Sequence, residues 1–540
     1  MPHADTTAAS TPTAGRLGDA LAAWSTLIGA DRVSTDERAL AERQRDTSDF
    51  ATAAVAVLRP ASADQVSDIV LIAREHGIAL YPVSTGRNWG YGSGNAPRSG
   101  CAILDLSDLR GISLDAEFGL VTLEPGVTQG MLRDWLDERR HAFMVPTTGA
   151  GPSTSLLSNA LERGYGITPI TDHAAAVVSL EAVLADGTTY RSPLRDYSGA
   201  AGFRWGLGPY LDGIFSQGTA GIVTSMTLSL APLPDRVQAF YFWLENEEDL
   251  ERAVLAIRRI RQQAGGTVGG INLMSAMRLV AMSQPYPDLP ANEALSEETA
   301  NEIAAGSGLG AWMGVGTIYG TPRHAAATRA LVRRELKGVA RRVLFMTASR
   351  ARRLASVARR IPATQSTART LEVMANAIDL MRGEPSEATL ALPYWKTGRP
   401  LPGSPLHPAR DGAGILWYSP VIPLSGDQAR TFATMVRRVC AEHGFEAPIT
   451  LTTVSDSTFD STLPLLFDAL DPEQCARADA CWRALYEAGR ELGFHPYRVH
   501  HRDTDLVVDS SHGYWRALDT ITRALDPAGT LTPGRWVVAN

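Results

Sequence analysis

The chain has 540 residues, 44% of them hydrophobic and 20% charged, and its formal net charge at pH 7 is -7. This length predicts two or three globular domains, and the negative charge argues against a nucleic-acid-binding protein, whose surface would be basic. No apolar run approaches the roughly 20 residues that a membrane span needs, so we expect no membrane segment.

Residues 1–15 are small and polar and lack the basic start and apolar centre of a secretory signal, so we expect a disordered tail and a cytoplasmic protein. The four cysteines are too few for a disulfide scaffold. Cys475 and Cys481 do not have the spacing of zinc ligands, and we expect no metal site.

The first half of the chain alternates short strands with amphipathic helices. Residues 16–50 have helical periodicity, and the stretches 63–76 and 127–140 carry apolar residues on one helical face. Strand-like runs are expected at 55–58, 78–83, 101–106, 119–123, 144–148, 177–184, 190–191 and 225–230. Pro232 and Pro234 close this part.

The second half contains strands at 237–242 and 415–422, loop-rich segments at 283–310 and 396–414, and helices at 250–264, 326–360, 425–443, 472–492 and 514–525. The many arginines of 326–360 are typical of a solvated helix face, with docking of an anionic partner as the alternative. Residues 306–311 match G-x-G-x-x-A, but they follow a polar helical stretch and not a strand, which argues against a Rossmann fingerprint.

One glycine-rich stretch, at residues 81–94, reads Tyr-Pro-Val-Ser-Thr-Gly-Arg-Asn-Trp-Gly-Tyr-Gly-Ser-Gly. Its glycines permit positive φ and a close approach of the backbone to another group. Successive backbone N–H groups in such a turn form an anion site suited to a diphosphate. A plain surface loop is the alternative, but the donors Ser84, Thr85, Arg87 and Asn88 favour a phosphate cradle.

Several blocks together resemble a known family. These are Ser-Thr-Gly-Arg-Asn-Trp-Gly-Tyr-Gly (84–92), Gly-Pro-Tyr-Leu-Asp-Gly-Ile-Phe-Ser-Gln (208–217), Arg-Ala-Asp-Ala-Cys (477–481) and Tyr-Arg-Val (497–499). In this order, from about Ala54 to Arg535, they resemble the FAD-dependent vanillyl-alcohol oxidase and p-cresol methylhydroxylase (PCMH) family. The resemblance implies an α+β fold, with a PCMH-type FAD-binding domain of two subdomains and an α+β cap domain over the flavin.

The resemblance also implies domain limits and cofactor contacts. We expect the FAD-binding domain at 16–232, the cap at 233–494, and a return to the FAD-binding domain at 495–540. The residues expected to bind FAD are Ser84, Thr85, Gly86, Arg87, Asn88, Trp89, Gly90, Pro146, Thr147, Gly149, Gly164, Gly166, Gly221, Ile222, Val223 and Arg535.

The expected chemistry is removal of a hydride from the carbon next to a phenol ring, which gives a quinone methide. By resemblance, Tyr91, Tyr497 and Arg498 hold the phenolate through charge-assisted hydrogen bonds. Asp172 matches the catalytic carboxylate, and Arg535 matches a cation beside the reduced flavin. Read singly, Tyr91 would fix its own loop and Arg498 would form a structural ion pair.

The cap is expected to supply the aromatic pocket walls Trp395, Trp417 and Tyr418, with an aromatic core as the equal alternative. Many relatives tether FAD covalently to a histidine or tyrosine of the cap. Ile415 stands at the histidine position, and Pro393 near the tyrosine position. We therefore predict dissociable FAD, with Tyr394 or His407 as fallback anchors.

The leading functional hypothesis is oxidation of 4-alkylphenols or 4-hydroxybenzyl alcohols, with O2 or a redox carrier as electron acceptor, by a homodimer or higher homo-oligomer. An alternative keeps the fold and changes the substrate to a non-phenolic alcohol or a 2-hydroxy acid. A flavin carrier without turnover is a third hypothesis, which Asp172 and the three phenolate residues disfavour.

Overall fold

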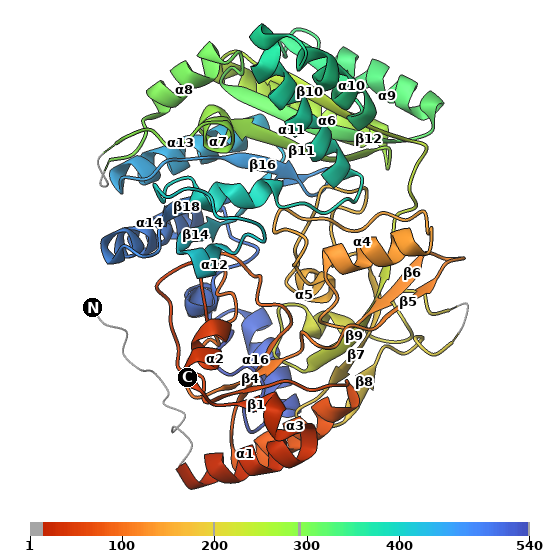
Figure 1. The fold of residues 1–540 in the computed structure, drawn as a ribbon, viewed down its shortest axis with the longest axis vertical. Helices are drawn as coiled ribbons and strands as arrows, with labels where there is room; N and C mark the ends of the chain where they lie inside the picture. Colours follow the sequence, from red (N-terminus) through yellow and green to blue (C-terminus); the bar gives the residue numbers. More distant parts are fainter. Residues whose placement is uncertain (1–13, 198–199, 290–292, 538–540) are drawn as a thin grey trace.

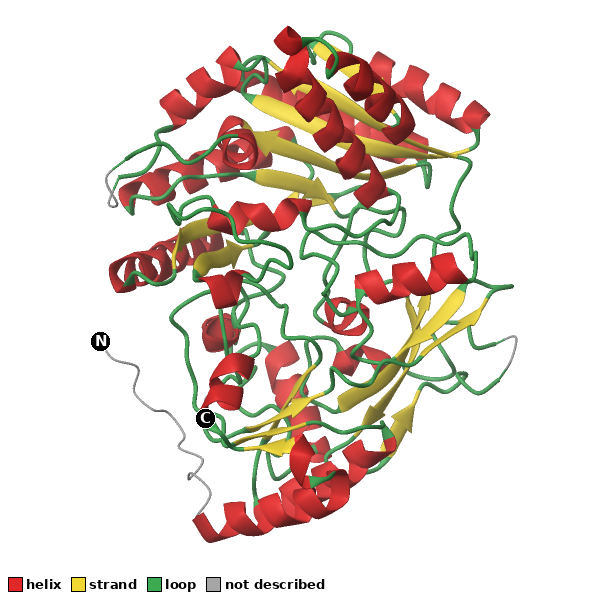
Figure 2. Ribbon diagram, viewed as in Figure 1, coloured by secondary structure: helices red, strands yellow, loops and turns green. Residues whose placement is uncertain are grey.

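The computed structural model describes residues 14–197, 200–289 and 293–537, and shows helices and sheets throughout (Figures 1 and 2). Of the expected tail, residues 1–13 lie outside the described residues, whereas Ala14 and Gly15 already belong to helix α1 (Ala14–Ile28). No helix within the described ranges is long and apolar enough to cross a membrane.

A small four-stranded sheet carries the glycine-rich loop. Its order is β1 (Val33–Ser34), β2 (Ala56–Leu58), β4 (Ala102–Asp105) and β3 (Leu80–Val83), with β2, β4 and β3 parallel. Helix α3 (Asp64–His76) packs on it through the buried face formed by Val66, Ile69, Val70 and Ala73. Strand β3 ends directly at the loop, so the sheet holds the loop in place.

A five-stranded antiparallel sheet forms the second layer of the lower half in Figure 1. Its order is β5 (Ile112–Asp115), β6 (Leu120–Leu123), β9 (Ile222–Ser229), β7 (Val177–Val183) and β8 (Thr189–Arg191). Leucines of α4 (Gln129–Glu138) and α5 (Leu156–Leu161) pack into the same core as its valines and methionine. The loop after α5 then runs toward the centre of the molecule.

The upper half of Figure 1 holds a seven-stranded antiparallel sheet. Its order is β13 (Arg342–Met346), β10 (Arg236–Leu244), β12 (Trp312–Gly320), β11 (Val268–Ser275), β16 (Thr450–Thr453), β17 (Thr458–Ser461) and β15 (Val421–Pro423). Helices pack against the sheet in two separate cores, namely α6 (Leu250–Ala264), α9 (Pro322–Glu335), α13 (Gly426–Glu442) and α14 (Pro472–Glu491) in one, and α10 (Ala348–Ala358) and α11 (Gln365–Met381) in the other.

Two smaller features connect the halves. The hairpin-like pair β14 (Ala413–Tyr418) and β18 (Leu463–Asp468) lies under the large sheet. After α14 the chain returns to the lower half, where α16 (Gly513–Leu525) lies and Leu80 of β3 donates its N–H to Thr530 O over 2.7 Å. The C-terminal segment is thereby attached to the sheet that carries the glycine-rich loop.

Three expected elements differ from the structure. The stretch 144–148 forms no strand and runs as extended loop. Strand β13 interrupts the expected helix 326–360, because Thr347 accepts a hydrogen bond from the Arg350 N–H and starts α10 anew. The expected loop 283–310 contains α8 (Glu297–Gly306), which Ser296 caps by accepting from Thr299 N–H. Both caps are ordinary polar residues in sequence, which explains why the boundaries were missed.

Candidate active site

A cavity of about 380 Å³ lies where the glycine-rich loop, the large sheet and the C-terminal return meet. The loop contributes residues 81–89, Tyr91 and Ser93, and the C-terminal return contributes Tyr497, Arg498 and His501. Segments far apart in sequence thus share one enclosed space. The part from the expected cap is Asn272, Met274, Arg278, Met282, Leu380, Thr389, Leu390, Leu392, Pro393, Ile415, Trp417, Thr450, Thr452 and Thr462.

Trp417 fixes the cap strand β14 against the loop. Its Nε1–H donates to the Trp89 carbonyl over 3.0 Å. Gly90 has φ +76°, and a Cβ placed there would lie 2.4 Å from Trp417 Cδ1. Thr47 also connects the loop to strand β14, because its Oγ1 accepts from Gly90 N–H at 2.9 Å and donates to Ile415 O at 3.0 Å. Glycine is required at position 90 both for its backbone angle and for this close approach.

The cavity wall fits the diphosphate and ring system of FAD. Ser84, Thr85, Gly86, Arg87, Asn88 and Trp89 all line it, as do Gly149, Gly164 and Gly166. Among the described residues, Arg87 Nε and Trp89 Nε1 are buried and have no hydrogen-bond partner. Buried donors without partners are costly, and an anion placed against this loop would satisfy them.

Seven residues expected to contact FAD are not among those that line this cavity, and their contact with FAD stays a prediction: Gly90, Pro146, Thr147, Gly221, Ile222, Val223 and Arg535. Thr147 is fully buried and donates from Oγ1 to Leu380 O over 2.7 Å. Ile222 and Val223 belong to β9 and face two different hydrophobic cores.

Tyr91, Tyr497 and Arg498 do come together. The Arg498 guanidinium carbon lies 4.1 Å above the Tyr91 ring centroid, and Arg498 also donates to the Asn88 side-chain oxygen. The Tyr91 hydroxyl lies 2.9 Å from Ser419 Oγ. Burial raises the pKa of Tyr91 to about 12 even though Arg498 opposes the shift, so Tyr91 stays a neutral hydrogen-bond donor at pH 7.

Glu162, which sequence reasoning missed, holds the arginines. Arg535 donates to both Glu162 oxygens at 2.8 Å, and Arg498 Nε lies 3.6 Å from Glu162 Oε2. Burial raises the pKa of Glu162, but Arg535 and Arg498 outweigh it and lower this pKa to about 2. Arg535 therefore pairs with Glu162 and does not line the cavity.

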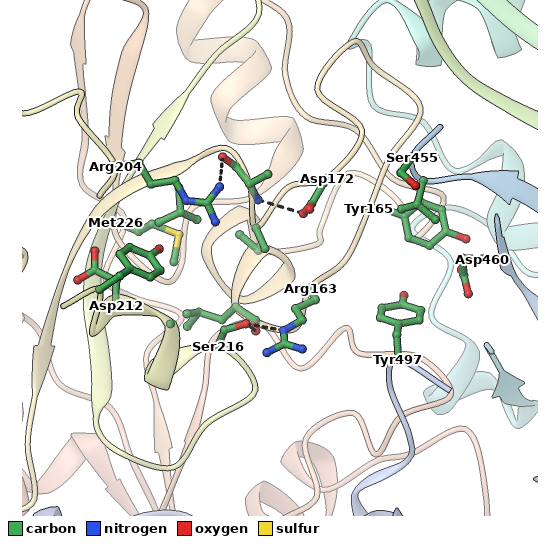
Figure 3. A pocket seen from close by; sticks show the side chains of 18 of the residues that line it. Arg163, Tyr165, Asp172, Arg204, Asp212, Ser216, Met226, Ser455, Asp460 and Tyr497 are labelled. Atoms are coloured by element: carbon green, nitrogen blue, oxygen red, sulfur yellow. Dashed lines mark hydrogen bonds between the residues drawn. The ribbon is translucent and has the colours of Figure 1, made fainter. Parts of the chain in front are cut away.

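Asp172 is absent from the wall of this cavity and lines a second one, which it shares with Tyr497 and Asp460. Its side chain is exposed and accepts from Ala175 N–H at 3.0 Å, and the second cavity, of about 490 Å³, is also lined by Arg163 and Arg204 (Figure 3). The turn Thr171–His173 directs the carboxylate outward, since the neighbouring Thr171 and His173 are the buried ones.

Asp460 is a buried carboxyl group beside Tyr165 and Tyr497. It lies on β17, is 1% exposed, and faces Tyr165 and Tyr497, which line both cavities (Figure 3). Burial raises its pKa to about 7, with Tyr165 opposing the shift. A single acidic residue inside the otherwise apolar and hydroxyl-bearing stretch 458–466 was the available sequence signal.

Of the expected pocket walls, only Trp417 lines the cavity. Trp395 donates from Nε1 to Gln284 O at 2.9 Å, and Tyr418 is fully buried in the core of the large sheet. The fallback anchors also lie elsewhere, since the Tyr394 hydroxyl donates to Asp411 at 2.6 Å and accepts from the His407 N–H at 3.0 Å. The described part of the chain holds no cluster of three metal-ligating side chains.

Comparison with known proteins shows the family and the fold of this chain. Residues 54–192 match the FAD binding domain family. The chain is 33% identical over 531 residues to 1'-carboxy-chondrochloren decarboxylase of Chondromyces crocatus, covering 96% of this chain and 97% of the relative. It is 28% identical over 538 residues to the 4-cresol dehydrogenase [hydroxylating] flavoprotein subunit of Pseudomonas putida, covering 97% and 96%. The solved 4-ethylphenol oxidase from Gulosibacter chungangensis, in its isoeugenol complex, matches with TM-score 0.86 at 25% identity, covering 98% of both chains.

The fold and the cradle loop define an FAD-dependent oxidoreductase with an FAD-binding domain and a cap domain. The chain belongs to the vanillyl-alcohol oxidase and p-cresol methylhydroxylase family, as its sequence motifs predicted.

Proposed function

We propose that this enzyme oxidises para-substituted phenols, namely 4-alkylphenols and 4-hydroxybenzyl alcohols. The convergence of Tyr91, Tyr497 and Arg498 in the cavity beside the FAD cradle carries the proposal. Bound FAD supplies the oxidant that takes a hydride from the carbon next to the ring. The relatives named for 4-cresol and 4-ethylphenol support the same substrate class.

The chain's own part is to hold the substrate oxygen as a phenolate. Two tyrosine hydroxyls and one guanidinium donate to that oxygen, which lowers the phenol's pKa. Electron density from the phenolate then assists loss of the hydride and leaves a quinone methide. Asp460, with its pKa of about 7, accepts the phenol's proton by way of the Tyr497 or Tyr165 hydroxyl. Asp172, which the resemblance assigns as the catalytic carboxylate, lines the adjoining cavity with Tyr497 and is the alternative proton acceptor.

The alternative substrate is a non-phenolic alcohol or a 2-hydroxy acid. Arg498 could bind the carboxylate of the hydroxy acid, but neither alternative gives Tyr91 and Tyr497 a phenolate to bind. Anaerobic mixing of the oxidised holoenzyme with 4-ethylphenol or vanillyl alcohol, against glycolate or lactate, separates the two. Bleaching of the flavin band by the phenols alone supports the proposal, and bleaching by the hydroxy acids alone overturns it.

A second candidate is oxidative decarboxylation, favoured by the relative named a decarboxylase, which is 33% identical over nearly the whole chain. A quinone methide with a carboxylate on the next carbon can lose CO2. The electron pair of the broken C–C bond then restores the aromatic ring and leaves a 4-hydroxystyrene, while the hydride's two electrons reside on the flavin. Headspace CO2 and the vinylphenol product, each counted per flavin reduced, test this candidate.

We also propose that FAD is dissociable. The residues that the cap contributes to the cavity include no histidine, tyrosine or cysteine that could form a covalent bond to the flavin. A denaturing gel should show no fluorescent protein band, and a band that survives would overturn this proposal.

The remaining proposals are O2 as direct electron acceptor, a homodimer or higher homo-oligomer, and a cytoplasmic location. Hydrogen peroxide formed per phenol consumed in air tests the first. Light scattering and cell fractionation test the other two.

A further inference from the structure

Arg278 is a half-buried cation in the cavity that the phenol mechanism does not use. It lies on α7 (Ala276–Ser283) and lines the same cavity as Tyr91 and Arg498. Its Nε and Nη1 atoms are buried and have no hydrogen-bond partner among the described residues. Burial lowers its pKa to about 10, with Tyr165 opposing the shift, so Arg278 remains charged at pH 7.

Two further polar groups without partners lie on the same wall. Asn272 of β11 and Thr450 of β16 line the cavity, and the Asn272 Oδ1 and Thr450 Oγ1 atoms are buried without hydrogen bonds in the described structure. The two strands are neighbours, with Met274 opposite Thr450 and Asn272 opposite Thr452. The Thr450 hydroxyl can therefore donate from the sheet that lies beside α7, whereas the Asn272 Oδ1 atom can only accept.

Tyr165 lies between Arg278 and the phenolate residue Tyr497. Its ring centroid lies 6.2 Å from that of Tyr497, and it is the neighbour that acts electrostatically on Arg278. On the other side, Met282 is one helical turn beyond Arg278, lines the cavity and is 51% exposed. The cavity therefore runs from the phenolate end, past Tyr165 and Arg278, toward solvent at Met282.

A buried charge without a partner costs several kcal/mol of folding stability. Such a charge is typical of a site where a bound ligand supplies the missing partner. A guanidinium whose Nε and Nη1 atoms lack protein partners can donate charge-assisted hydrogen bonds to a carboxylate. We infer that Arg278, with Thr450, binds a carboxylate on the side chain of the substrate, so the preferred substrates are 4-hydroxyphenyl compounds that carry a carboxylate away from the ring. This inference rests on the proposed phenol oxidation and narrows its substrate class.

The test compares an acid with its neutral amide. Dithionite-reduced holoenzyme cannot turn either over, so calorimetry under nitrogen measures binding alone. We expect 3-(4-hydroxyphenyl)propanoate to bind wild type more tightly than 3-(4-hydroxyphenyl)propanamide. Arg278→Met should weaken binding of the acid by roughly 10- to 100-fold and leave that of the amide within about twofold. Arg353→Met, at an exposed position on α10, is the matched control.

Each other outcome overturns the inference. Equal affinity of wild type and Arg278→Met for the acid would show that Arg278 does not hold it, and loss of FAD from Arg278→Met would assign the arginine to the cofactor. Because the change removes an unpaired buried charge, the melting temperature of Arg278→Met should not fall. If it does fall, Thr450→Val carries the same binding comparison. Failure of 4-ethylphenol to bleach wild-type flavin would contradict the proposed function separately.

Discussion

Glu162 accepts hydrogen bonds from both terminal nitrogens of Arg535, each 2.8 Å long, although 373 residues separate the two in sequence. The same carboxylate lies 3.6 Å from Arg498 Nε. One buried anion therefore positions the arginine that stacks on Tyr91 and ties the C-terminal return to the loop after α5. The phenolate residues depend on it although it donates nothing to the substrate.

Glu162→Gln should destabilise the protein by about 3–5 kcal/mol at pH 7, because it leaves buried arginine charge uncompensated. Thermal unfolding measures the loss. Glu487→Gln, which breaks the exposed pair with Arg490, should cost about 1 kcal/mol or less. Equal costs for the two variants would contradict the structural role of Glu162.

The pH dependence of Glu162 has a definite sign. Its folded pKa of about 2 lies below the ordinary value of 4.5, so its contribution to stability is present above pH 4.5 and is lost as the pH falls toward 2. Wild type should therefore lose stability more steeply than Glu162→Gln across this window, as denaturant unfolding at a series of pH values would show.

Asp460→Asn should raise stability at pH 8. The folded pKa of about 7 exceeds the ordinary value of 3.8, so the protonated form stabilises the fold at low pH and this contribution is lost as the pH rises through 7. Three pKa units correspond to a cost on the order of 4 kcal/mol, which asparagine avoids. The same variant should remove the fall in the flavin reduction rate that wild type shows below about pH 7. A variant with unchanged stability and an unchanged rate profile would contradict both roles.

Gly90→Ala should reduce FAD retention. The Cβ would lie 2.4 Å from Trp417 Cδ1, at a backbone φ of +76° that alanine disfavours by roughly 1–2 kcal/mol. Gly208→Ala is the matched control, because it has a φ of +82° with nothing within 4 Å of the added atom. We expect the flavin-to-protein absorbance ratio to drop in the first variant and to hold in the second. A similar ratio in both would mean that contact with Trp417 does not shape the cradle.

Tyr91→Phe should slow reduction of the flavin by 4-ethylphenol by roughly 10- to 100-fold, because one donor to the phenolate is lost. FAD content should stay at the wild-type level, since the cradle contacts lie in residues 84–89. Tyr197→Phe, at an exposed tyrosine, controls for the substitution itself. A large loss of FAD from Tyr91→Phe would place this residue with the cofactor.

Local pattern was enough to predict much of the fold and part of the site. Glycine spacing predicts the glycine-rich loop, and apolar patterning predicts helix α3 and strand β10. The order of the motifs identified the family. Tyr91, Tyr497 and Arg498 followed from that order, and the structure brings them together.

The missed residues depend on contacts between distant segments. Glu162 precedes an arginine in an ordinary polar turn, and only the fold brings Arg535 to it. Arg278 is one arginine in an amphipathic helix, where a solvated position is the usual expectation. Asp172 was assigned by resemblance to a motif, and its place at the second cavity beside Asp460 and Tyr497 is a tertiary property that the motif does not carry.

The most direct measurement compares 4-ethylphenol with 4-ethylanisole, its methyl ether, in anaerobic stopped-flow mixing with the oxidised holoenzyme. The two share the reacting carbon, but only the phenol can be held as an anion by Tyr91, Tyr497 and Arg498. The phenol should bleach the flavin and the ether should not. Bleaching by both at similar rates, or by neither, would contradict oxidation through a bound phenolate.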